Sequence, residues 1–217
     1  MVHADTRVLV FTRTAGYRHI SIEVGVAALT DLVAAEATED AGVFTPENLA
    51  RYRVVVFLNT SGPVLDDDQR QALAAYVRGG GGFVGVHCAA ATEYDWPEYG
   101  ELVGARFDQH PDVQPAVIHV ADGDHPATAH LSDRWEHVDE WYNFHTNPRP
   151  YVRVLLTVDE STYQGGRMGA DHPIAWCRPY GQGRSFYTAL GHTVEAYADP
   201  AFRAHLAGGL RWAAGQA

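Results

Sequence analysis

The feature that most constrains the fold is an alternation of short apolar runs with amphipathic segments in the N-terminal part of the chain. Three runs, RVLVFT (7–12), RVVVFLNT (53–60) and GFVGVH (82–87), are almost continuously apolar and rich in β-branched residues. Such runs are typical of strands buried on both faces of a parallel sheet. Segments 21–37 and 65–80 lie between them and have apolar residues at helical spacing. Because the order is strand, helix, strand, helix, strand, we predict right-handed crossovers and a parallel sheet.

The remaining secondary structure is predicted from local signals. Ser21 is placed to cap the first helix, and segment 65–80 has an acidic first turn, a basic last turn and a glycine stop. Residues 37–40 could add an edge strand. Further helices are expected at 97–107 and 199–215, further strands at 116–122, 135–144 and 153–160, and a hairpin at 172–192. Because the chain has no internal repeat and no low-complexity linker, we predict one domain over residues 1–217.

Composition disfavours several classes of function. The formal net charge is −11, so neither nucleic acid nor an anionic membrane surface is expected as a partner. No run of about 18 apolar residues is present to cross a bilayer, and the first residues lack the pattern of a signal peptide. The two cysteines, Cys88 and Cys177, form no disulfide framework and no CxxC motif. We therefore expect a reduced, cytoplasmic protein.

Histidines follow the predicted strands at the edge where open parallel sheets bind their ligands. His19 follows the first strand, NTSGP (59–63) follows the second, His87 ends the third, and His192 follows the hairpin. The loops expected at the opposite edge carry no histidine. We therefore predict that His19, His87 and His192 converge in one pocket. The alternative is that they are solvated loop histidines, which are common at any surface.

Six stretches spread over most of the chain are characteristic of one family. They are GYRH (16–19), DDDQRQALAAYVRGGGGFVGVHCAA (66–90), ELVGARFDQHP (101–111), DEWYNF (139–144), HPIAW (172–176) and YGQGRSFYTALGH (180–192). Together they resemble the ThuA-like, or trehalose-utilisation, family. The resemblance implies an α/β, flavodoxin-like three-layer sandwich with a mostly parallel central sheet, as in class I glutamine amidotransferases. It also implies a role in carbohydrate metabolism.

The similarity to glutamine amidotransferases suggests a role for two of the histidines. In those enzymes a strand ends in a nucleophilic cysteine, whereas GVH places His87 at that point of this chain. Their catalytic histidine also ends a strand, and LGH places His192 there. Cys88 comes one residue later, so its side chain should point elsewhere. We expect Cys88 to be small buried filler, with a nucleophilic role as the alternative.

The candidate site combines groups for acid–base chemistry with groups that bind metals. Glu140 lies among aromatic residues, which should raise its pKa and suit it to proton transfer. Two histidines can exchange protons near neutral pH, and neutral imidazole also binds divalent metals such as zinc. The candidates are His87, His192 and Glu140 for catalysis, His19, His87 and His192 as tentative metal ligands, and His19, Trp96, His172, Asn59 and Ser61 for substrate binding. His172 could instead cap a turn, and the same two roles, pocket lining or turn capping, are open for His110.

The function predicted from these residues is an enzyme that acts on a sugar or keto-sugar without a cysteine nucleophile. His192 would serve as base, His87 as acid or metal ligand, and amides of the 59–63 loop would stabilise an oxyanion. An isomerase, a lyase or a hydratase would fit this description. The alternatives are a non-catalytic sugar-binding or regulatory module and, less favoured, an amidotransferase. The expected partner is a small sugar-like ligand, and a homo-oligomer is left open.

Overall fold

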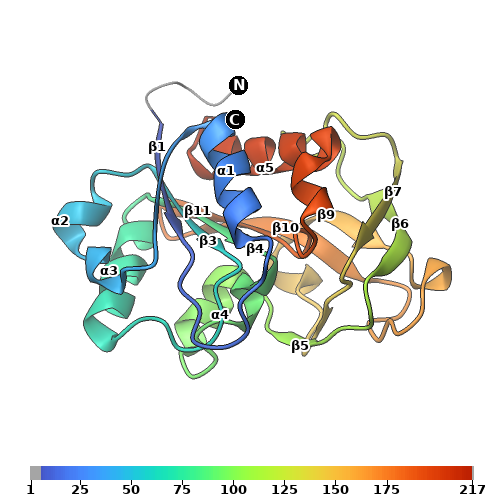
Figure 1. The fold of residues 1–217 in the computed structure, drawn as a ribbon, viewed down its shortest axis with the longest axis horizontal. Coiled ribbons are helices and arrows are strands. Elements are labelled where there is room, and N and C mark those ends of the chain that lie inside the picture. The colour runs from blue at the N-terminus through green and yellow to red at the C-terminus, as the bar shows by residue number, and fades with distance from the viewer. Residues whose placement is uncertain (1–5, 217) are drawn as a thin grey trace.

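A nine-stranded sheet forms the centre of the molecule (Figure 1). The structure is a computed structural model that describes residues 6–216. The strand order is β2-β1-β3-β4-β11-β10-β9-β6-β7. The strands of this sheet are β1 Arg7–Phe11, β2 Ala34–Thr38, β3 Val54–Leu58, β4 Gly82–Val86, β6 Gln114–Val120, β7 Arg134–Asp139, β9 Arg153–Val158, β10 Pro173–Tyr180 and β11 Gly183–Thr188.

The sheet has a parallel half and an antiparallel half. Strands β2, β1, β3, β4 and β11 pair in parallel, whereas β10, β9, β6 and β7 extend the sheet in antiparallel pairs. Every residue of β3 and β4 is buried, as expected for strands covered on both faces. The predicted α/β, flavodoxin-like fold is confirmed, and the parallel half carries the loops that the sequence singled out.

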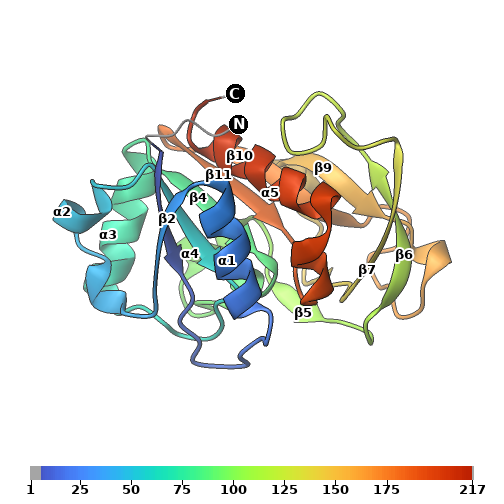
Figure 2. The same ribbon diagram turned by 45° about the horizontal axis from the view of Figure 1, so that its top comes forward.

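Helices cover both faces of the parallel half (Figure 2). Helices α1 and α5 lie side by side on one face, where Gly25 of α1 approaches the side chain of Leu58. On the other face Tyr99 of α4 packs against Phe57 and Phe83. The helices are α1 Ile22–Leu32, α2 Pro46–Leu49, α3 Asp67–Arg78, α4 Pro97–Val103 and α5 Pro200–Ala213. Among residues 6–216, none of these helices is long and apolar enough to span a bilayer.

Two predicted elements are shorter than the sequence indicated. The helix expected at 21–37 ends at Leu32, and residues 34–38 form the edge strand β2 instead of residues 37–40. Ser21 occupies the N-cap position, but its hydroxyl accepts no hydrogen bond from the helix amides and instead donates to the carbonyl of Gly191. The helix expected at 97–107 ends at Val103 because Gly104 adopts a left-handed conformation.

The strand expected at 135–144 is interrupted at the site. Strand β7 ends at Asp139, and residues 143–144 form the short strand β8, which pairs with β5 (Phe107–Gln109) in a separate two-stranded sheet. Glu140 therefore lies just beyond a strand end rather than within a strand. The interruption frees its side chain from the alternation of a continuous strand, so that it can point along the sheet edge toward the histidines.

Candidate functional site

A cavity of about 450 Å³ opens at the carboxyl ends of the parallel strands. Its wall includes the loop after β1, with Tyr17 and His19, and the loop after β3, with Ser61. His192, from the loop after β11, and Glu140, from the end of β7, also line it. This is the edge at which open α/β sheets bind their ligands. The cavity volume falls in the range of small-molecule sites.

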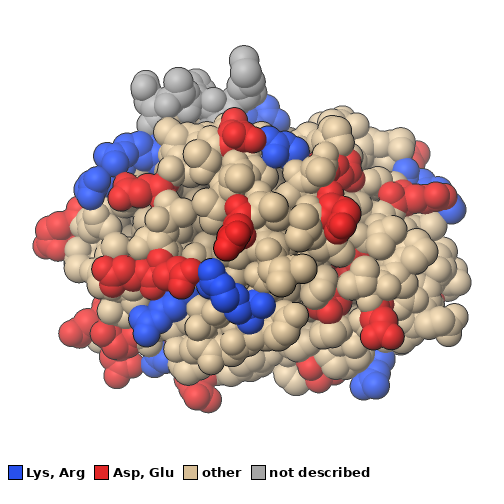
Figure 3. Space-filling view, viewed as in Figure 1, with Lys and Arg blue, Asp and Glu red and all other residues tan. Residues whose placement is uncertain are grey.

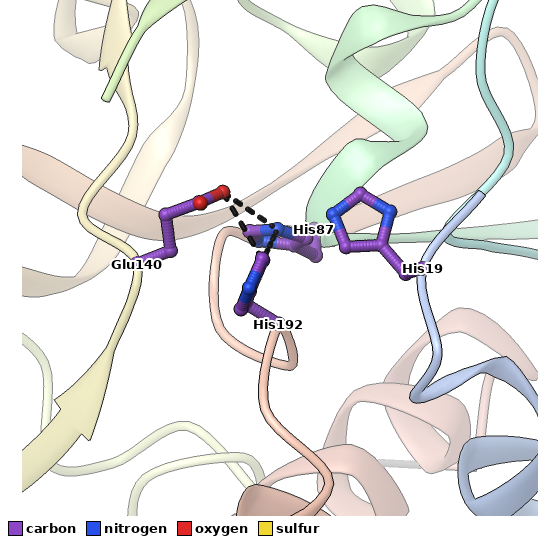
Figure 4. A group of neighbouring side chains, drawn as sticks. All are labelled: His19, His87, Glu140 and His192. Atoms are coloured by element: carbon purple, nitrogen blue, oxygen red, sulfur yellow. Dashed lines mark hydrogen bonds and ion pairs between the residues drawn. The ribbon is translucent and has the colours of Figure 1, made fainter. Parts of the chain in front are cut away.

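Four side chains lie close together (Figure 4): His19, Glu140 and His192 line the cavity, and His87 is fully buried beside them. Each offers one ligand atom, and the four atoms lie within 4.8 Å of one another. Oε2 of Glu140 is 3.4 Å from Nε2 of His87 and 3.2 Å from Nδ1 of His192. The two imidazole nitrogens are themselves 3.3 Å apart. The structure thus brings the three predicted histidines together with the predicted carboxylate, Glu140.

The backbone at the end of β4 sets the direction of His87. Its φ angle is 48°, a left-handed conformation that is uncommon for a residue with a side chain. Nδ1 of His87 lies 2.7 Å from the carbonyl oxygen of Ala189. Because a carbonyl only accepts, Nδ1 carries the proton, and the lone pair of neutral His87 is on Nε2. This lone pair faces Glu140 and His192, as a proton acceptor or a metal ligand requires.

A tightly held glycine turn carries His192. Gly191 has a φ of 109°, and a Cβ atom there would lie 2.8 Å from the hydroxyl of Tyr197. The Gly191 carbonyl accepts hydrogen bonds from Ser21 Oγ, Asn59 Nδ2 and the Tyr197 hydroxyl. Only glycine combines this conformation with such close neighbours. The turn therefore fixes the backbone from which His192 projects.

The charges of the four groups are coupled. Burial by itself would raise the pKa of the Glu140 carboxyl, but hydrogen bonding and attraction from His192 and His87 in their protonated forms outweigh burial and lower this pKa from 4.5 to about 2. The raised pKa expected for Glu140 is therefore wrong, because the histidines, not the aromatic residues, are its close partners. Burial opposes charge on His192, but its hydrogen bond and attraction to Glu140 raise its pKa. Burial, together with repulsion from His87 and His192, lowers the pKa of His19 to about 3.

The four groups match the donor set of a divalent transition metal. Around a tetrahedral ion with bonds of about 2.0–2.1 Å, neighbouring ligand atoms are about 3.3–3.4 Å apart. The three distances among His87, Glu140 and His192 lie between 3.2 and 3.4 Å. In Figure 4 the ring of His19 presents a nitrogen toward the other three groups, and its ligand atom lies within 4.8 Å of theirs.

The sequence pattern of the trehalose-utilisation (ThuA) family matches residues 7–213, nearly the whole chain. The chain belongs to the ThuA family. A protein described as ThuA-like from Bacteroides uniformis superposes with a TM-score of 0.84 at 26% identity, covering 97% of this chain and 91% of its own. Another, from Parabacteroides merdae, has a TM-score of 0.81 at 22% identity and covers 96% and 90%.

A third solved structure supports the fold at lower similarity. A protein of Salmonella typhimurium described as cytoplasmic has a TM-score of 0.67 at 13% identity, covering 95% of this chain and 98% of its own. At this identity the likeness concerns the fold alone. Among curated proteins, none matches the sequence. The description of the matching family, trehalose utilisation, indicates a sugar-related role.

Three of the predicted substrate-binding residues of this ThuA chain lie outside the cavity wall. Trp96 faces a separate depression, with the Arg70 guanidinium carbon 6.0 Å from its ring centre. His172 is fully buried, with Nε2 2.9 Å from the carbonyl oxygen of Tyr142. Asn59 is also fully buried and holds the Gly191 turn. These three residues were predicted to bind substrate because they follow a strand or lie in a family stretch. Such a position does not fix where a side chain points.

Two amides of the loop after β3, which was predicted to stabilise an oxyanion, already donate to backbone carbonyls. The amide of Asn59 donates to the carbonyl of Val86, and that of Gly62 donates to the carbonyl of Ala91. Ser61 does line the cavity, but its hydroxyl donates to the carbonyl of Tyr17 at 2.7 Å. These bonds tie together the loops after β1, β3 and β4. The loop therefore contributes to the cavity wall, and the amides of Asn59 and Gly62 are not free to bind an oxyanion.

Cys88 lines the cavity, contrary to the expectation that it points away. The chain turns into a 3₁₀ helix at His87, so the alternation of a strand does not continue to Cys88. The thiol is nonetheless ill suited to act as a nucleophile. Burial raises its pKa to about 11, which keeps it protonated at neutral pH. In this member of the ThuA family Cys88, the residue after His87, is thus part of the cavity wall.

Two wall residues were underweighted or missed by sequence reasoning. His110 lines the cavity, and its Nδ1 lies 3.0 Å from Oε1 of Glu140, the oxygen that does not face His87. Tyr142 packs its ring against His87 with centroids 4.1 Å apart. Both belong to family-like stretches, 101–111 and 139–144. Nothing in the local sequence shows that these two stretches meet, since the meeting depends on the pairing of β5 with β8.

Proposed function

We propose that this ThuA-family protein is a metal-dependent enzyme that acts on an uncharged sugar or keto-sugar by acid–base chemistry. The observation that carries the proposal is the convergence of His19, His87, His192 and Glu140 on one point of the cavity. Three neutral imidazoles and one carboxylate form a donor set that suits zinc and similar ions. The sugar-related part of the proposal comes from the family.

The four residues would hold the metal in distinct ways. His87 would bind through Nε2, since its Nδ1 donates to Ala189, and this second bond fixes the ring as in many metal sites. Glu140 would supply the single negative charge. A bound divalent ion supplies Lewis-acid polarisation of a substrate oxygen or lowers the pKa of a water molecule. Binding by His192 requires its Nδ1 to be free of the proton that it shares with Glu140 in the metal-free protein.

The cavity wall favours an uncharged substrate. No lysine or arginine is among its lining residues within the described part of the chain. Tyr17, Tyr94, Phe107 and Tyr142 give it several aromatic faces, which suit the C–H surfaces of a sugar ring. A phosphosugar would lack a cationic partner apart from the metal. Hence a neutral sugar fits better than a phosphorylated one.

His110 is the wall residue best placed to exchange protons with a substrate. It lies at the cavity, its side chain is 40% exposed, and its ring is held by Oε1 of Glu140. In the proposed reaction His110 would transfer a proton at a carbon next to a carbonyl, the group whose polarisation a metal held by the four residues would supply. Removal of this proton and its return at a neighbouring atom give isomerisation. Loss of a β-substituent instead gives elimination, so both reaction types remain within the proposal.

The surroundings of the site bear on the expected partners. On the face shown in Figure 3 acidic side chains are spread over the surface, and basic ones do not gather into a continuous patch. This supports a small neutral ligand over nucleic acid, in line with the net charge of −11. A cytoplasmic location is part of the proposal and is supported by the related Salmonella protein described as cytoplasmic.

Deuterium exchange tests the enzyme proposal and separates it from a binding module. Untagged, zinc-loaded protein is incubated in D₂O with a panel of neutral keto-sugars, and proton NMR follows the C–H signals next to the carbonyl. We expect one substrate to lose such a signal at a rate that depends on the protein, and His110→Gln to slow the loss at least tenfold. Binding of a sugar with no exchange and no product would instead support the non-catalytic module.

A further inference from the structure

Asp139, the last residue of β7, is a carboxylate without an ordinary counter-charge. Its side chain is fully buried, and no lysine or arginine of the described chain pairs with it. The ion pair that it does form is with His137, whose Nε2 lies 3.6 Å from Oδ2. A buried carboxylate in such surroundings is costly unless its oxygens are fully hydrogen-bonded. Its partners therefore indicate why the position holds an aspartate.

Those partners are three backbone amides of the candidate site. Oδ1 accepts hydrogen bonds from the amide of Glu140 at 2.9 Å and from the amide of His192 at 3.0 Å. Oδ2 accepts from the amide of Gly191 at 2.7 Å. Glu140 and His192 lie on different elements, at the ends of β7 and β11. One carboxylate thus joins the backbones of two of the four residues in the site.

The opposite side of the same turn is held as well. In the peptide that joins Gly191 to His192, the carbonyl accepts from Ser21, Asn59 and Tyr197, and the N–H of His192 donates to Asp139. A peptide group held at both its C=O and its N–H has little freedom to rotate. The spacing of 3.2 Å between Glu140 Oε2 and His192 Nδ1 therefore depends on Asp139.

We propose that Asp139 is a positioning residue, which holds the Gly191–His192 turn against Glu140 and thereby sets the spacing of the metal ligands. The inference rests on the proposed metal site, but Asp139 acts through backbone amides and touches no ligand atom of that site. Residues behind the ligands commonly change metal affinity 10- to 100-fold when they are substituted. We assign an effect of this size to Asp139.

The test compares Asp139→Asn with Asp199→Ala. An asparagine presents one acceptor oxygen and one NH₂ donor, so at least one of the three amides would face another donor. Asp199 is the matched control, because it caps helix α5 and lies 3.4 Å from the other side of His137 but binds no amide of the site. Asp139→Asn removes a fully buried carboxylate that binds the turn. Asp199→Ala removes a half-buried carboxylate that does not bind it.

Two measurements are made on each protein. In chelated protein, two-bond ¹H–¹⁵N NMR correlations report the protonation and hydrogen bonding of the His192 ring. Zinc affinity is then measured by competition with a chelator. We expect Asp139→Asn to shift the His192 nitrogens and to weaken zinc binding about 10- to 100-fold. Asp199→Ala should leave the ring shifts unchanged and the affinity within twofold.

The outcomes separate this inference from the proposed function. If Asp139→Asn lowers the melting temperature but matches Asp199→Ala in ring shifts and affinity, Asp139 is only structural and the inference is overturned. If the parent protein binds no zinc, the proposed function fails, and the inference then stands or falls on the His192 shifts in metal-free protein. Should Asp139→Asn not fold, Asp139→Glu keeps the carboxylate but displaces its oxygens from the three amides by one methylene group. Unchanged His192 shifts and zinc affinity in that variant would also overturn the inference.

Discussion

At the residue scale, the chemistry of the site depends on which atoms of each side chain face one another. Glu140 directs Oε2 toward His87 and His192 and Oε1 toward His110. Its carboxylate is therefore shared between the proposed metal ligands and the proposed proton-transfer residue. His87 directly follows β4, where glutamine amidotransferases have a cysteine, and its imidazole offers a lone pair that can bind a metal or a proton.

The Glu140 carboxylate should control the protonation of His192. Burial opposes charge on His192, and its raised pKa comes from Glu140. In Glu140→Gln we therefore expect the pKa of His192 to fall in chelated protein, as followed by NMR titration. A histidine whose pKa is raised in the folded protein stabilises the fold, fully below pH 6.5, and this stabilisation is lost as the pH rises through the raised pKa. The variant should therefore be less stable than the parent mainly below pH 6.5.

The same substitution should weaken zinc binding, since it removes the only negative charge among the four ligands. A loss of at least about tenfold, or about 1.4 kcal/mol, is expected. Glu136→Gln on the exposed part of β7 serves as control and should leave both quantities unchanged. A His192 pKa that does not move in Glu140→Gln would mean that the two side chains are not paired in solution.

At the element scale, capping determines where the helices begin. Asp66 and Gln69 form a capping box at the start of α3, with both reciprocal hydrogen bonds present. We expect Asp66→Ala to lower the free energy of unfolding by about 1 kcal/mol, measured by urea denaturation. Zinc affinity should not change, because α3 contributes no residue to the cavity.

A neighbouring acidic residue provides the comparison for this prediction. Asp68 lies in the first turn of α3 and contributes only through the helix dipole. Asp68→Ala should therefore cost a few tenths of a kcal/mol. Equal losses for Asp66→Ala and Asp68→Ala would show that charge, rather than the capping hydrogen bond, stabilises this helix end.

The sequence predicted elements well where one local signal dominated. Strands β1, β3 and β4 are continuous apolar runs, and α3 has a cap, charged ends and a glycine stop, so their bounds were close. The break after Asp139 was not predictable in this way. It depends on hydrogen bonds from Gly191 and His192, which lie about fifty residues further along the chain.

The candidate site could be predicted in part for the same reason. Because parallel strands end at one edge, the convergence of His19, His87 and His192 followed from the strand order. The direction of each side chain did not. Trp96 and His172 were predicted to bind substrate from similar positions in the sequence. In the structure Trp96 faces a separate depression, and the ring of His172 lies against the carbonyl oxygen of Tyr142. Loop residues are oriented by tertiary hydrogen bonds, which leave no periodic trace in the sequence.

At the scale of the whole molecule, buried neutral histidines make the fold sensitive to acid. His205 of α5 is fully buried, and burial lowers its pKa from 6.5 to about 3. Burial likewise lowers the pKa of His125 to about 4. The unfolded chain binds protons at these positions below pH 6.5, whereas the folded chain does not. Stability should therefore fall as the pH falls below 6.5, by about 2 kcal/mol for His205 between about pH 7.5 and pH 5.

His205→Asn tests this assignment. The amide NH₂ can replace the hydrogen bond from Nδ1 to the carbonyl of Ala127, but it does not titrate. Urea denaturation at the two pH values should show a shallower pH dependence than in the parent protein, even if the variant is less stable at neutral pH. The exposed His130 gives the control, His130→Asn, which should keep the parent slope. A slope unchanged in His205→Asn would contradict a neutral His205 in the folded protein.

The central claim is that His19, His87, Glu140 and His192 form one metal centre. Its most direct test is the zinc stoichiometry of untagged protein, stripped with chelator and then titrated with zinc in competition with a chelating dye. We predict one tightly bound ion per chain, and loss of that binding in His192→Ala, whose fold is retained in chelated protein. A parent protein that takes up no zinc, or a His192→Ala variant that binds it as tightly, would contradict the claim.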